Sequence, residues 1–84
     1  MHQIRFTRRA EKDLRKLNKI YLPKVSKSFE ALQLNPLLGQ KMSGEFDGSY
    51  RIKIPPIRII YFPDFKNKVI WIEAIGQRQG IYKN

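Results

Sequence analysis

Three basic side chains in the stretch 50–62 are the strongest candidates for chemistry: Arg51, Lys53 and Arg58. Around Pro55-Pro56 the residues alternate between apolar and basic or aromatic types, the period of a half-buried strand. If the prolines form the tip of a tight hairpin, Lys53 lies opposite Arg58. The other opposed pairs are then Ile54 with Ile57, Ile52 with Ile59, and Arg51 with Ile60. Opposed residues share a face, so isoleucines form a core face and the three cations share the other.

This grouping of cations needs a physical reason. Like charges opposite each other in a sheet cost a few tenths to about 1 kcal/mol. Either the long side chains splay apart in water, or the face holds an anion. Because proline donates no N–H to a ladder, a wider tip is an alternative that would change the pairs but not the alternation.

Cations beside an aromatic ring suit an RNA phosphodiester. Guanidinium groups bind phosphate through two hydrogen bonds and stabilise charge that grows in a transition state. RNA carries its own nucleophile, the 2′-hydroxyl beside the scissile phosphate, so a base, an acid and charge stabilisation would suffice without metal. Arginine keeps its proton and is a poor base. Lys53, between Arg51 and Arg58, is the cation whose neutral form is most favoured by neighbouring like charges, and is our hypothesis for the base.

Further along the chain, Arg78 and Tyr82 could join this group, and Tyr50 and Tyr61 are additional aromatic candidates. A base stacked on such a ring gains about 1–3 kcal/mol.

Composition sets the outer limits. The 84 residues suffice for one domain, 1–84, with one modest core. The absence of cysteine excludes disulfides, thiolate nucleophiles and zinc–thiolate sites. His2 is the single histidine, and apart from Glu45 and Asp47 the acidic residues have no ligand spacing, so neither a metal nor a cofactor is expected.

Net charge points to an anionic partner. Seventeen Lys and Arg residues against seven Asp and Glu give +10, which fits nucleic acid, an anionic membrane surface or an acidic protein. No apolar run approaches the length of a membrane span, and the N-terminus lacks the apolar region of a signal peptide. We therefore expect a cytoplasmic protein without a membrane partner.

Two helices are predicted before the central hairpin. Gln3–Phe6 alternates as a strand does, Thr7 is a good N-cap, and the pattern turns helical from Arg8. Pro23 fits the first turn of a second helix, which Asn35 ends. Opposite the apolar side of the first helix runs a basic stripe: Arg8, Lys12, Arg15 and Lys19. Such stripes are commonly plain solvated surface; contact with RNA is the functional alternative.

The remaining elements complete an α+β domain. Residues 36–49 are expected to be irregular, whereas 69–75 is a strand so apolar that both its faces should be covered, with Trp71 in the packing. The order predicts an N-terminal strand, a two-helix hairpin and an antiparallel three-strand meander. These would form one four-stranded sheet with the helices on one face, leaving the cations on the other.

Several motifs together resemble the RelE/ParE toxin superfamily over essentially the whole chain. They are Tyr50-Arg51-Ile52-Lys53-Ile54, Arg58-Ile59-Ile60-Tyr61, Ile75-Gly76-Gln77-Arg78, Tyr82, and the opening Ile4-Arg5-Phe6-Thr7-Arg8-Arg9-Ala10. The resemblance implies the toxin of a type II toxin–antitoxin pair. RelE-like members are ribosome-dependent endoribonucleases, or mRNA interferases, that cut messenger RNA in the A site and leave a 2′,3′-cyclic phosphate.

The same resemblance implies roles for individual residues. Arg51 and Lys53 would flank the phosphate, one of them serving as base, and Arg58 would stabilise it. Arg78 matches a general acid or charge stabiliser, and Tyr82 matches a tyrosine that stacks on the substrate base. The basic stripe would rest on ribosomal RNA. Implied partners are the ribosome with its messenger RNA and a cognate antitoxin with an acidic toxin-binding segment, which alone would link the toxin to operator DNA.

The chain departs from the family pattern in ways that bear on function. Lysine is common where this chain has Arg51, and a flexible turn is common at Pro55-Pro56. Two other functions stay open: ParE-like members poison DNA gyrase, and a non-catalytic module would bind nucleic acid without cutting it. Arg78 together with Tyr82 favours RNA cleavage, because a gyrase poison has no evident need for that pair.

Overall fold

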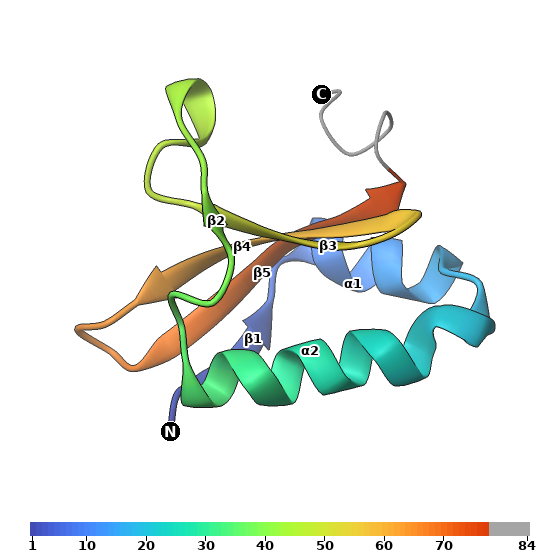
Figure 1. Ribbon diagram of the computed structural model, residues 1–84, viewed down its shortest axis with the longest axis horizontal. Coiled ribbons are helices and arrows are strands. Elements are labelled where there is room, and N and C mark those ends of the chain that lie inside the picture. Colours follow the sequence, from blue (N-terminus) through green and yellow to red (C-terminus); the bar gives the residue numbers. More distant parts are fainter. Residues whose placement is uncertain (78–84) are drawn as a thin grey trace.

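The computed structural model describes residues 1–77, and five strands in one sheet form its frame. The sheet order is β1-β5-β4-β3-β2, and both α-helices lie on the same side of it (Figure 1). In chain order the elements are β1 (Gln3–Phe6), α1 (Arg8–Lys16), the 3-10 helix η1 (Lys19–Tyr21), α2 (Leu22–Leu34), β2 (Gln40–Lys41), the 3-10 helix η2 (Gly44–Phe46), β3 (Tyr50–Ile54), β4 (Ile57–Asp64) and β5 (Val69–Gln77). The predicted α+β class, with helices on one face, is confirmed.

Thr7 fixes the start of α1 against the sheet. Its hydroxyl oxygen accepts a hydrogen bond from the Ala10 amide at 3.1 Å, which caps the helix. The same hydroxyl lies 3.3 Å from the carbonyl of Ile72 and 3.1 Å from that of Glu73, and donates to this pair. One side chain therefore ends β1, begins α1 and ties both to β5.

The core lies between the helices and one sheet face. Its buried residues come from α1, α2, β4 and β5, and they are Ala10, Val25, Leu32, Ile57, Ile59, Tyr61, Ile70, Ile72 and Ile75. Partly buried side chains of β1 and β3 complete it, among them Phe6, Ile52 and Ile54. We call the opposite side of the sheet the open face.

The β3–β4 hairpin has the predicted register. Lys53 pairs with Arg58, and the flanking pairs are Ile54 with Ile57, Ile52 with Ile59 and Arg51 with Ile60. Pro55 and Pro56 form the tip, joined by a cis peptide bond. The alternation on either side of the prolines thus determined which side chains share a face.

The prediction of four strands was wrong by one short strand. Residues Gln40–Lys41 within the expected loop pair antiparallel with Arg51 and Tyr50. Two residues are too few to display an alternation, so the sequence pattern could not reveal β2. The phenol of Tyr61 fixes the segment that leads into β2. The Gly39 amide donates a hydrogen bond to Tyr61 Oη at 2.8 Å, and that hydroxyl donates one to the Pro36 carbonyl at 2.9 Å.

Trp71 is not in the core, which corrects the prediction that both faces of β5 are covered. Its neighbours Ile70 and Ile72 are buried beneath the helices, so alternation turns Trp71 to the open face, where it is 36% exposed. On that face, a small second cluster covers only part of the sheet: Met42 and Phe46 pack on Ile60 and Ala74.

A β-bulge interrupts the β4–β5 ladder at Glu73. Ile60 pairs with Ala74 but Tyr61 pairs with Ile72, which leaves Glu73 without an opposed residue. Its carboxylate Oε1 accepts a hydrogen bond from the buried Ser49 hydroxyl at 2.5 Å. The bulge therefore anchors the segment 42–49 to the sheet just before β3 begins.

No helix in residues 1–77 is both long and apolar enough to cross a bilayer.

Candidate active site on the open face

Arg51, Lys53 and Arg58 gather on the open face, and we refer to them as the cationic group. Lys53 and Arg58 are register partners on β3 and β4, and Arg51 lies two residues before Lys53 on the same face. Lys53 is exposed, while both arginines are partly buried. The sheet thus places the exposed ammonium group of Lys53 between the partly buried side chains of Arg51 and Arg58.

Gln40 holds the guanidinium of Arg51. Arg51 Nε and Nη2 lie 3.2 and 3.1 Å from Gln40 Oε1, and both donate to it. Gln40 and Arg51 are also backbone partners in the β2–β3 ladder. Sequence reasoning missed Gln40, because nothing marked it as part of a strand.

Arg58 lies between Lys53 and Gly76. Gly76 is its register partner on β5 and carries no side chain. A cavity of about 260 Å³ adjoins the pair, lined by Lys53, Pro55, Pro56, Ile57 and Arg58. Its size is close to that of the smallest ligand pockets, about 300 Å³. Two of its lining residues are cations and the other three are apolar.

Tyr50 and Tyr61 do not face the cationic group. Tyr61 is fully buried in the core, and its ring stacks on that of Tyr50, with centroids 5.7 Å apart and an interplanar angle of 24°. Burial raises the pKa of Tyr61 above its ordinary value, against the opposing hydrogen bond from Gly39. The two tyrosines therefore support the fold and do not contribute to chemistry on the open face.

The basic stripe was predicted on the first helix, but α1 ends at Lys16, so the prediction was wrong for Lys19. Arg8, Lys12 and Arg15 belong to α1 and Lys19 to η1, and all four side chains are exposed. The helix buries Ala10 on its opposite side. Arg78 and Tyr82, also predicted for the site, lie outside the described residues.

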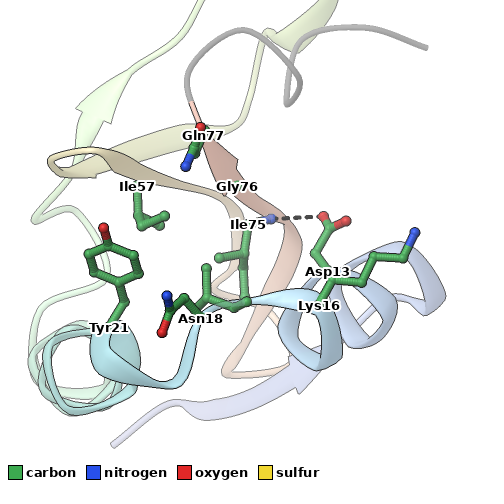
Figure 2. A pocket seen from close by; sticks show the side chains of 9 residues that line it. Asp13, Lys16, Asn18, Tyr21, Ile57, Ile75, Gly76 and Gln77 are labelled. Carbon is green, nitrogen blue, oxygen red and sulfur yellow. Dashed lines mark hydrogen bonds between the residues drawn. The ribbon is translucent and has the colours of Figure 1, made fainter.

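A second cavity, of about 280 Å³, lies on the helix side of the sheet (Figure 2). It opens between the end of α1, η1 and the adjoining ends of β4 and β5, and Ile57, Ile75, Asn18 and Tyr21 are among its lining residues. At its rim, Asp13 accepts a hydrogen bond from the Ile75 amide at 3.0 Å. Ile57 lines both cavities, so the tip end of the β3–β4 hairpin lies between this pocket and the cationic group.

Metal-ligating side chains do not cluster in the part of the chain that the structure describes. No three histidine, aspartate or glutamate residues within 1–77 are placed so that they could hold an ion.

Comparison with known proteins gives the class of the molecule. The family model described as the ParE toxin of the type II toxin–antitoxin system parDE matches residues 4–82. The RelE1 protein of Methanocaldococcus jannaschii is 33% identical over 82 residues, covering 92% of this chain and 90% of that protein. The chain belongs to the RelE/ParE superfamily of type II toxin–antitoxin toxins.

Solved structures agree with this fold. The RelBE2 toxin–antitoxin complex of Mycobacterium tuberculosis contains a chain with 28% identity and a TM-score of 0.80, covering 92% of this chain and 98% of that one. The isolated E. coli RelE toxin gives a TM-score of 0.84 at 22% identity, covering 94% of this chain and 86% of that chain. At that lower identity the likeness concerns the fold alone.

Proposed function

We propose that this toxin is a ribosome-dependent, metal-independent endoribonuclease that cleaves messenger RNA in the A site. One observation carries the proposal: Lys53 lies directly opposite Arg58 on the open face, with Arg51 on the same face and a cavity beside the pair. Three cations on adjoining positions repel each other and favour a bound anion. The resemblance to RelE-like members favours a messenger RNA phosphate as that anion.

The reaction would proceed by attack of the 2′-hydroxyl on the adjacent phosphorus. Lys53 acts as the general base and takes the proton from that hydroxyl, and the new P–O bond expels the 5′-oxygen of the next nucleotide. The products are a 2′,3′-cyclic phosphate and a 5′-hydroxyl end. Arg58 and Arg51 neutralise the charge that accumulates on the phosphate oxygens.

Two further roles come from the resemblance alone. Arg78 would protonate the leaving oxygen or stabilise its charge, and Tyr82 would stack on the substrate base. The basic stripe of Arg8, Lys12, Arg15 and Lys19 would bind ribosomal RNA through its phosphates.

The proposed partners follow from this assignment. The toxins in the M. tuberculosis RelBE2 and E. coli RelBE structures were solved with their antitoxins. By analogy, a cognate antitoxin with an acidic segment would neutralise this chain's cations and link it indirectly to operator DNA. Acting on ribosomes, the toxin would work in the cytoplasm.

Inhibition of DNA gyrase is the second candidate function. The observation in its favour is that the matching family model is that of the ParE toxin. It predicts inhibited supercoiling and no cleavage of RNA.

Primer extension on a reporter messenger RNA tests the two candidates. Purified toxin is added to a reconstituted translation system, with ribosomes present or omitted. Cuts within codons that depend on ribosomes support the nuclease, whereas an intact transcript during active translation rules it out. A parallel gyrase supercoiling assay then decides whether the second function applies.

A further inference from the structure

Two exposed aromatic side chains lie next to each other at the end of the open face away from the cationic group. Phe62 on β4 and Trp71 on β5 are register partners, so their side chains project from the same face. Trp71 is also the register partner of Arg5 on β1. We call these three residues, which cross three neighbouring strands, the aromatic row.

The aromatic row is not used by the core. The helices pack on the other face, and the second cluster on the open face is centred on Ile60 and Ala74. The backbone at Gly48 passes beside the Phe62 ring, since a Cβ there would lie 3.4 Å from it. Phe62 stays 40% exposed and Trp71 36% exposed. An exposed Trp–Phe pair in a chain of this size indicates a binding surface.

The aromatic row carries one cation, and two carboxylates lie near it. Arg5 is exposed at the β1 end of the row. The acids nearest in register, Asp64 and Glu73, accept hydrogen bonds from Asn67 and Ser49 respectively. Cation and aromatic rings together are the chemistry that binds unpaired bases of single-stranded nucleic acid.

The position of the aromatic row fits one strand of RNA. Phe62 follows Arg58 by four residues on β4, a separation of about 13 Å along an extended strand. The aromatic row and the cationic group therefore contact different nucleotides.

We propose that Trp71 and Phe62 form a stacking platform for an unpaired base of single-stranded RNA, flanked by Arg5. The inference rests on the proposed function, because it adds a second contact to the RNA that the cationic group would cleave. The platform provides a binding contact to the substrate outside the reacting phosphate.

Trp71 is the single tryptophan of the chain, so its fluorescence reports on this platform alone. The probe is a 2′-O-methyl RNA hexamer, which cannot be cut because it lacks the 2′-hydroxyl. We expect the hexamer to quench the emission of Trp71 upon binding. Inorganic polyphosphate, which carries similar charge but no bases, should bind without quenching.

Variants separate stacking from general charge. Phe62→Leu and Trp71→Leu should weaken binding of a labelled hexamer about 5- to 150-fold, measured by fluorescence anisotropy. Phe65→Leu is the matched control, since Phe65 is 53% exposed in the β4–β5 turn and packs edge-on against His2, outside the aromatic row. It should bind as the unaltered protein does. Because all three positions are exposed, the variants should fold, which their circular dichroism and thermal unfolding verify.

The outcomes distinguish this inference from the proposed function. Absent binding, binding without quenching, or equal losses for Phe62→Leu and Phe65→Leu would each overturn the platform. Quenching only by an acidic peptide would instead assign the aromatic row to a protein partner. Ribosome-dependent cleavage without quenching of Trp71 would support the nuclease function and contradict the stacking platform. Quenching without cleavage would support the platform and contradict the nuclease function.

Discussion

The carboxylate of Asp13 on α1 accepts the backbone amide of Ile75 on β5 at 3.0 Å, in the position where a neighbouring strand would otherwise pair. β1 pairs with β5 only as far as Ile72, so within residues 1–77 the rest of that edge has no strand partner. A helix side chain satisfies the amide instead, immediately before Gly76, the partner of Arg58. A residue on the helix side thus fixes the strand that borders the cationic group.

Loss of the Asp13 carboxylate should destabilise the fold. Asp13→Ala leaves the Ile75 amide unpaired, and we expect a loss of about 1–3 kcal/mol in the free energy of unfolding. Asp13→Asn keeps an oxygen acceptor and should lose less. Urea unfolding measures both, with the exposed Glu11→Ala on the same helix as a control that should change little. Equal stabilities for Asp13→Ala and Glu11→Ala would contradict the assignment.

Substitutions in the cationic group should abolish cleavage while leaving the fold intact. Removing the base with Lys53→Ala should lower ribosome-dependent cleavage about 10²- to 10⁴-fold. Lys53→Arg should also fail, because arginine keeps its proton. Lys24→Ala, at an exposed position on α2, is the control with the same charge change. If both Lys53 variants cut messenger RNA at the unaltered rate, Lys53 is not the base.

Gly39 should not tolerate a side chain. A Cβ there would lie 2.6 Å from the Arg51 carbonyl oxygen and 2.8 Å from Tyr61 Oη. Gly39→Ala must therefore displace β3 or the phenol, at a cost of about 1–3 kcal/mol. Gly44→Ala offers a comparison, since no atom lies within 4 Å of a Cβ there and only the positive φ of 68° opposes it. Thermal unfolding should show the larger decrease for Gly39→Ala.

Tyr61 should make the fold sensitive to alkaline pH. Burial raises its pKa above 10.0 in the folded state, so the folded protein holds the phenolic proton more tightly than the unfolded chain. Its contribution is complete below the unfolded pKa and is lost as pH rises through the folded pKa. We expect the difference in the free energy of unfolding between the unaltered protein and Tyr61→Phe to become smaller above about pH 10. Chemical denaturation from pH 8 to 11 measures it, and the partly exposed Tyr21→Phe should keep the alkaline loss of the unaltered protein.

The basic stripe should govern the salt dependence of ribosome binding. If Arg8, Lys12, Arg15 and Lys19 contact ribosomal phosphates, each substitution to glutamine should weaken binding. Each should also reduce the slope of log affinity against log salt by about 0.7 to 0.9. Lys27→Gln on α2 is the control with an equal charge change. An unaltered slope in the four stripe variants would show that the stripe is solvated surface and does not contact ribosomal phosphates.

The register of the β3–β4 hairpin could be predicted from the sequence, because the alternation of residue types and the two prolines allow few registers for Tyr50–Phe62. The sequence also located both helices, since Thr7 and Pro23 are strong start signals that the structure uses. The resemblance identified the superfamily from motifs whose order spans the chain.

Other features depend on contacts between distant segments. Gln40 becomes a partner of Arg51 only because Tyr61 holds residues 36–39, which no local pattern records. Trp71 was expected in the core because β5 is apolar at nearly every position, yet helices cover only one of its faces. The roles of Arg78 and Tyr82 stay predictions.

The parallel pairing of β1 with β5 has a consequence for how this protein folds as it is synthesised. Gln3 pairs with Val69, 66 positions later, so the first strand to be synthesised has no partner until the last one follows. Contacts of such long range slow folding, because loop closure precedes the gain from pairing. β1 therefore has no strand partner while α1, α2 and β2–β4 are being made, and the sheet can be completed only after β5 has followed.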